Sequence, residues 1–130
     1  MTVTAMVLTL NHFPNGKDNT QKRSIYNGTA AIGASPLTYA SGGVPVIWSQ
    51  MANAEGELFT AEEATPIECW FESVSGSGYW YVYNAATSKL QIFVGGASAN
   101  LPAAELAAGA VPAGVSGDSI VFHAEFLRAA

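Results

Sequence analysis

The sequence predicts an all-β domain, and three observations lead to that prediction. Short apolar and aromatic runs recur along the 130 residues, separated by clusters of Gly, Pro, Asn and Ser. Charged residues make up only 12% of the chain and hydrophobic residues 49%, unlike a Glu- and Lys-rich helical protein. Two aromatic or β-branched runs, 79–83 and 89–94, flank a polar loop at 84–88, which indicates a hairpin. We therefore expect residues 1–130 to form a single antiparallel β-sandwich, jelly-roll-like, with at most one or two short helical turns.

The opening strand is expected over residues 2–10 and has two apolar faces. Side chains alternate along a strand, so one face carries Met6, Leu8 and Leu10 and the other Val3, Ala5 and Val7. A strand that is apolar on both faces has more surface to bury than one small domain needs. We therefore expect the face of Met6, Leu8 and Leu10 to form a subunit interface in a homodimer or homotrimer.

Gly and Pro place the boundaries of the next elements. A second strand is expected over 22–32, with a bulge near Gly28. Pro45 lacks a backbone N–H, so it makes the run 44–48 an edge or strand-start segment. Thr60–Glu63 fits a capping box, which favours one helical turn.

Two strands in the second half of the chain alternate clearly. In 67–73 we expect an inward face of Ile67, Cys69 and Phe71 and an outward face of Glu68, Trp70 and Glu72. In the closing strand, 119–127, we expect Ile120, Phe122, Ala124 and Phe126 to face the core and Val121, His123, Glu125 and Leu127 to face away. A short helix is expected over 101–109, ended by Gly109.

The charge is negative overall and unevenly distributed. A formal net charge of −5 argues against unaided nucleic-acid binding, which needs cations to neutralise phosphates. Lys17, Lys22 and Arg23 nevertheless make residues 1–54 net positive, whereas the rest of the chain is strongly acidic. This basic segment suits docking on an acidic neighbour, including another copy of the chain, and an ordinary solvated loop would have the same composition.

No catalytic, cofactor or metal site is expected, and we do not expect an enzyme. Gly28–Gly33 has the glycine spacing of a phosphate loop but no lysine follows it. Glu68 and Glu72 lie roughly 13 Å apart along a strand, too far for a glycosidase pair. His12 and His123 have no acidic or sulfur ligand at a recognisable spacing. The sole cysteine excludes an intrachain disulfide.

The sequence also indicates the cellular compartment in which the protein is expected. No secretory signal pattern opens the chain, and no stretch approaches the ~18 consecutive apolar residues of a membrane span. We expect a protein made in the cytoplasm that stays soluble until it assembles, with no membrane partner.

Trp70 and Trp80 leave two interpretations open. Trp70 shares its expected face with Glu68 and Glu72, and flat aromatic rings beside carboxylates are typical of sugar-binding modules. Tyrosine and tryptophan also supply large contact areas in cores and subunit interfaces. Both tryptophans are therefore candidates for an interface, with a carbohydrate platform as the alternative.

Several short motifs, in order, resemble the capsid decoration (cement) proteins of tailed bacteriophages. The motifs are Gly28-Thr29, Thr38–Pro45, the aromatic hairpin strand 78–83, Lys89-Leu90, Glu105–Gly109 and the closing run 121–126. The resemblance implies a small β-rich oligomer on the outer surface of the icosahedral head, where it bridges major capsid subunits without enzymatic activity. It thus implies a virion protein made in the cytoplasm of a bacterial host.

Overall fold

The computed structural model describes residues 2–3, 5–10, 17–18, 23–33, 36–52, 58–59, 66–95 and 102–127, and most of them lie in strands. The all-β prediction is confirmed. The strands are β1 (Val7–Leu10), β2 (Lys17–Asp18), β3 (Arg23–Ala31), β4 (Thr38–Tyr39), β5 (Val44–Pro45), β6 (Met51–Ala52), β7 (Leu58–Phe59), β8 (Glu68–Ser73), β9 (Tyr79–Asn84), β10 (Lys89–Val94), β11 (Ala104–Glu105), β12 (Gly109–Ala110) and β13 (Ile120–Leu127). The helical turns among these residues are η1 (Trp48–Gln50) and α1 (Ala113–Ser116).

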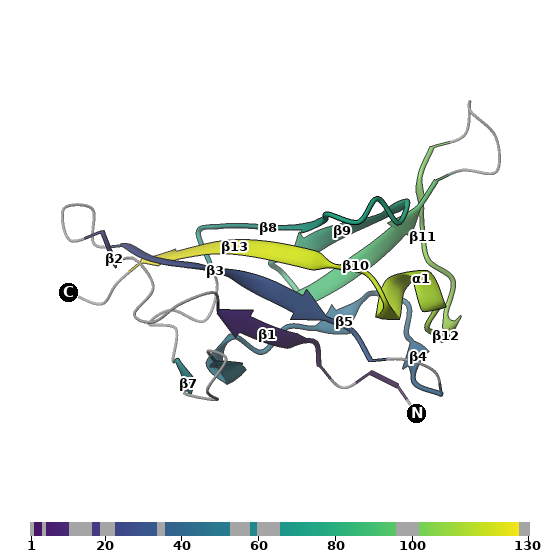
Figure 1. Ribbon diagram of the computed structural model, residues 1–130, viewed down its shortest axis with the longest axis horizontal. Helices are drawn as coiled ribbons and strands as arrows, with labels where there is room; N and C mark the ends of the chain where they lie inside the picture. The colour runs from purple at the N-terminus through teal and green to yellow at the C-terminus, as the bar shows by residue number, and fades with distance from the viewer. Residues whose placement is uncertain are drawn as a thin grey trace.

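Most strands belong to one curled sheet (Figure 1). Its order is β11-β10-β9-β8-β13-β3-β1-β6-β7, with β2 paired to β3 and β5 paired to β10. A second, two-stranded sheet joins β12 to β4. The described strand pairs are antiparallel except β1 with β6. The fold is sandwich-like, and a jelly-roll order of strands is not confirmed.

The segment 44–52 connects the two flanks of the curled sheet. At its start, Val44 pairs with Leu90 of β10, and at its end Ala52 pairs with Thr9 of β1. The Pro45 carbonyl accepts a hydrogen bond from the Met6 N–H (3.2 Å). Pro45 thus lies in a two-residue strand, the short edge element that its missing N–H predicts. Because one segment contacts both flanks, the sheet curls around a shared core.

Trp48 of η1 occupies the middle of that core. Its ring centroid lies 5.3 Å from that of Phe126, 5.6 Å from Tyr83 and 6.2 Å from Phe122. The indole N–H donates to the Tyr83 hydroxyl (3.1 Å), so its polar atom is satisfied inside the protein. The predicted inward side chains of the closing strand are all buried, namely Ile120, Phe122, Ala124 and Phe126.

Two predicted local elements are wrong. Residues 101–109 were expected to contain a helix, but Ala104–Glu105 pairs with β10 and Gly109–Ala110 pairs with β4. Hydrogen bonding to existing strands therefore outweighs the local helix preference of an alanine-rich run. The bulge expected at Gly28 is also absent, because β3 keeps a regular register with both β13 and β1 through this position.

The opening strand is shorter than predicted, and the face expected at a subunit interface faces the core instead. The strand begins at Val7, and Met6 and Leu8 are each only 4% exposed within this chain. They belong to the core of the monomer, so the prediction that they form a subunit interface is wrong. The core that the curled sheet encloses accommodates both side chains. Val7 on the opposite face is exposed.

Two further expectations concern the start of β8 and the helical turn that precedes it in the sequence. Ile67 was placed on an inward face, but β8 begins one residue later and Ile67 is exposed. Cys69 and Phe71 do face inward as predicted. The helical turn expected at Thr60–Glu63 lies outside the described residues.

Gly43 permits the close approach of β5 to β10, and this predicts a substitution effect. Its φ is +119°, and an added Cβ would lie 2.7 Å from the carbonyl oxygen of Leu90. We expect Gly43→Ala to lower the free energy of unfolding by about 1–3 kcal/mol, because the left-handed backbone and the contact are both unfavourable for alanine. Urea unfolding measures it. Gly95→Ala, where a Cβ meets open space, is the control and should unfold like the parent.

Candidate interaction surface

The side of β8, β9 and β13 that faces away from the core carries the predicted site tryptophans. Phe71 pairs with Tyr81, and both point into the core, so their strand neighbours point outward. His123 of β13 is directly opposite Trp70. The outward side chains that matter here, called the outer face below, are Glu68, Trp70, Glu72, Trp80, Val82 and His123.

The outer face exposes three large apolar side chains close together. Trp70 is 45% exposed, Trp80 54% and Val82 49%. The register places Val82 beside Trp70 on the neighbouring strand, and Trp80 pairs with Phe93 of β10. Single exposed apolar residues are normal on a monomer, but a contiguous aromatic patch is typical of a binding surface. Sequence reasoning placed Trp70 outward and named both tryptophans as interface candidates, and the structure brings them onto one face.

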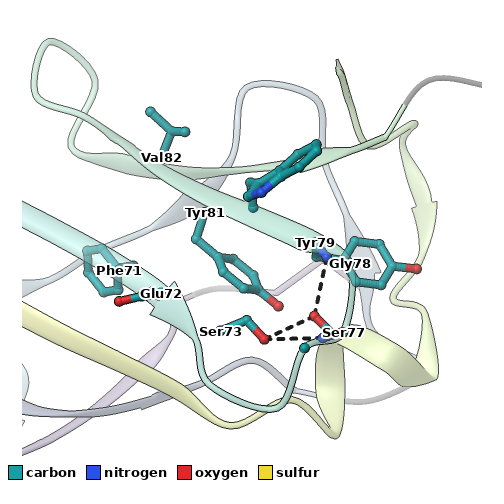
Figure 2. Close-up of a pocket in the computed structure, with 10 residues that line it drawn as sticks. Phe71, Glu72, Ser73, Ser77, Gly78, Tyr79, Tyr81 and Val82 are labelled. Carbon is teal, nitrogen blue, oxygen red and sulfur yellow. Dashed lines mark hydrogen bonds between the residues drawn. The ribbon is translucent and has the colours of Figure 1, made fainter. Parts of the chain in front are cut away.

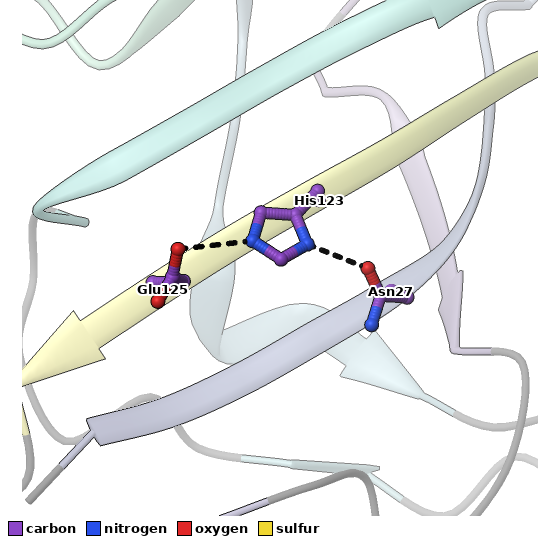
Figure 3. A network of polar contacts seen from close by, with 3 residues as sticks. All are labelled: Asn27, His123 and Glu125. Carbon is purple, nitrogen blue, oxygen red and sulfur yellow. Dashed lines mark hydrogen bonds and ion pairs between the residues drawn. The ribbon is translucent and has the colours of Figure 1, made fainter. Parts of the chain in front are cut away.

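His123 holds Trp70 in place. The two rings stack with centroids 5.5 Å apart and planes 12° from parallel. Figure 3 shows the imidazole between two acceptors, with Nδ1 2.7 Å from Asn27 Oδ1 and Nε2 3.1 Å from Glu125 Oε2. Both ring nitrogens therefore have a hydrogen-bond partner. Because the ring is tied at both nitrogens, it covers one side of Trp70 in a fixed orientation.

A hollow of about 460 Å³ adjoins this face where β8 and β9 part beyond the Phe71–Tyr81 pair (Figure 2). Trp80 and Val82 line it from the outer face, and Ser73 and Ser77 line it near the turn. Hydroxyl groups beside an aromatic ring would suit a sugar. Whether these hydroxyls are available depends on their present partners.

Those hydroxyls are already bound to Asp118. Ser73 donates to its carboxylate at 2.8 Å, Ser77 at 2.7 Å and Tyr81 at 2.6 Å, and Ser75 donates as well. Burial opposes ionisation of Asp118, but the hydroxyl donors outweigh it and lower its pKa to about 2. The carboxylate therefore ties the 74–78 turn to the start of β13. Our sequence reasoning missed this cluster, because the alternate serines at 73–77 do not by themselves indicate that Asp118 is their partner.

The predicted basic residues are only partly located. Lys17 and Arg23 lie on the paired strands β2 and β3, with Lys17 opposite Ser24 and Asp18 opposite Arg23. In Figure 1, β2 lies at one end of the long axis, and α1 lies at the other. The side chains of Lys17, Arg23 and Leu10, and the whole of Lys22, are outside what the structure describes.

Other site types find little support in the described part of the chain. Burial raises the pKa of the Cys69 thiol to about 12, so it stays protonated and unreactive at neutral pH. Within the described residues, no group of three or more His, Cys, Asp or Glu side chains is arranged to hold a metal ion. The same residues contain no helix that is long and apolar enough to cross a membrane. No family model, curated protein or solved structure matches the chain.

Proposed function

We propose that this chain is a capsid decoration protein of a tailed bacteriophage, which binds the outside of the icosahedral head and stabilises contacts between major capsid subunits. The observation that carries the proposal is the outer face, where Trp70, Trp80 and Val82 are exposed together on one side of the sheet. The ordered motifs that resemble decoration proteins support the same function. So does the low content of charged residues, which suits a domain that covers part of its surface in an assembly.

The outer face has the properties that docking on a large shell requires. Burying the exposed half of one indole, roughly 100 Å², contributes about 2.5 kcal/mol of binding free energy. Trp70 is already oriented by the His123 stack, so less conformational entropy is lost on binding. Several copies joined in one oligomer would add avidity on a shell with repeated sites.

A carbohydrate-binding or fibre-type module on the virion is the second candidate. The exposed tryptophans beside Glu68 and Glu72 favour it, since rings and carboxylates can stack on and hydrogen-bond a sugar. One feature counts against it: the serine hydroxyls near the hollow donate to Asp118, so they are not free to bind a sugar.

Co-sedimentation with purified heads tests the proposal. We expect the parent protein to pellet with heads and the Trp70→Ser/Trp80→Ser variant to remain in the supernatant, because its apolar contact area is lost. Val74→Ser removes an exposed apolar side chain from the turn, off the outer face, and should pellet like the parent. Failure of the folded parent protein to pellet would refute the decoration function. Release of the protein from heads by free sugars would favour the carbohydrate alternative.

A further inference from the structure

Carboxylates accompany the aromatic side chains of the outer face. Glu68, Trp70 and Glu72 point outward at alternate positions of β8, so a carboxylate lies on each side of the indole along the strand. Glu68 and Glu72 are both exposed. Neither forms an ion pair with a cation in the described part of the chain. The exposed apolar patch is therefore also negatively charged.

The strand register increases that negative charge. Glu125 of β13 lies directly opposite Glu68 of β8. Like charges at directly opposite positions of neighbouring strands repel, which destabilises the sheet. Glu125 Oε2 lies 3.1 Å from Nε2 of His123. Glu68 has no such contact with His123. Glu125 thus has a partner within the chain, and Glu68 is the carboxylate of this pair that a partner's cation can reach.

This charge excludes a purely apolar partner. Covering the tryptophans would also remove water from Glu68 and Glu72, and burying an unpaired carboxylate is costly. A partner that gains from the tryptophans must therefore bring cations that reach the carboxylates. Charge complementarity selects the chemistry of the partner, and the apolar patch supplies the contact area.

Arginine meets both requirements better than lysine. Its planar guanidinium stacks on an indole and also pairs with a carboxylate through two parallel hydrogen bonds. Side chains two apart in an extended segment point the same way at a spacing of roughly 7 Å, and those four apart at roughly 13 Å. Arginines at alternate positions would thus match the spacing of Glu68, Trp70 and Glu72.

We propose that the outer face binds an extended, arginine-bearing segment of the shell protein, with guanidinium groups on Glu68 and Glu72 and against Trp70. This inference rests on the proposed decoration function for the source of the segment. The chemistry of recognition rests on the outer face alone. The two parts can therefore be tested separately.

The chemistry is tested with a fluorescein-labelled peptide of alternating arginine and valine, titrated with the protein and followed by anisotropy. Matched peptides carry lysine or the uncharged citrulline in place of arginine. We expect the arginine peptide to bind most tightly, the lysine peptide more weakly and the citrulline peptide not at all. Glu68→Gln/Glu72→Gln should weaken arginine-peptide binding about tenfold, as should raising the salt concentration.

A charge-matched variant separates recognition from net charge. Ala85→Glu/Ala86→Glu, added to Glu68→Gln/Glu72→Gln, restores the net charge at two exposed positions of the turn between β9 and β10, and should bind the arginine peptide as weakly as Glu68→Gln/Glu72→Gln alone. Recovery of parental binding in the restored variant would overturn the inference, because net charge alone would then explain binding. Equal affinity for the arginine and citrulline peptides would overturn it as well.

The source of the segment is tested on heads. We expect Glu68→Gln/Glu72→Gln to sediment with heads about tenfold more weakly than the parent. If the parent and this variant bind heads equally, the decoration function stands and the inference is wrong. If the parent fails to bind heads but binds the arginine peptide through Glu68 and Glu72, the decoration function fails and the shell protein is the wrong source. Self-association that these two substitutions abolish would identify a second copy as the occupant and would likewise overturn the inference.

Discussion

Phe122→Ala is expected to destabilise the protein by about 3–5 kcal/mol, enough to unfold a small domain of ordinary stability. Phe122 is 1% exposed, and its ring centroid lies 5.7 Å from that of Phe71 and 6.2 Å from that of Trp48. Truncation leaves a cavity bounded by side chains from β8 and η1 as well as β13, which neighbouring groups cannot fill without moving. Urea unfolding followed by fluorescence measures the loss.

The control for this prediction is on the same strand. Val121 points to the opposite side of the sheet and is partly exposed, so Val121→Ala should cost about 1 kcal/mol or less. If Phe122→Ala unfolds at the same urea concentration as the parent, the register of β13 described above is wrong.

Asp118→Asn is expected to cost about 2 kcal/mol, because hydrogen bonds to a charged acceptor contribute more than neutral ones. Four hydroxyls, from Ser73, Ser75, Ser77 and Tyr81, donate to this carboxylate. The amide has no charge, and its NH2 group cannot accept from them. The 74–78 turn should therefore loosen, which faster amide hydrogen exchange in this turn would report.

The low pKa of Asp118 gives that prediction a pH dependence. The hydroxyl donors, which outweigh burial, lower the carboxyl pKa from its ordinary value of 3.8 to about 2 in the folded protein. The stabilisation is thus complete above about pH 4 and is lost as the pH falls toward 2. Asp118→Asn should lack this part of the acid transition, whereas Glu72→Gln, which changes an exposed carboxylate of β8, should keep it. Superimposable acid unfolding curves for the parent and Asp118→Asn would contradict the account.

Elements defined by local alternation were predictable from the sequence. The closing strand was expected over 119–127 and is observed as Ile120–Leu127, with its inward side chains buried as predicted. The hairpin of β9 and β10 was predicted with the loop in the observed place. In both cases the side-chain period of two and the adjacent turn residues specify strand and register together.

Features that depend on contacts between distant segments were not predictable. Met6 and Leu8 have the pattern of an interface, and only the closure by the 44–52 segment places them in the core. Residues 101–109 have the local composition of a helix but pair with β10 and β4 instead. The Asp118 cluster joins positions 37–45 residues apart, so no local pattern specifies it.

The candidate site was likewise predictable only in part. The outward direction of Trp70 was predicted from alternation alone, whereas for Trp80 alternation showed only that it points away from the tyrosines of its own strand. That His123 stacks on Trp70, and that Glu125 lies opposite Glu68, follows from the register between β13 and β8. The sequence therefore identifies the aromatic residues of the face, while the topology determines which charges surround them.

Electron cryomicroscopy of phage heads incubated with the protein tests the central claim most directly. The account predicts additional density at regularly repeated positions on the outer surface of the shell, with β8 and β9 turned toward the capsid subunits and Trp70 and Trp80 buried in the contact. Bare heads in the presence of excess folded protein would contradict the decoration function. Bound protein with Trp70 and Trp80 facing solvent would contradict the assignment of the outer face.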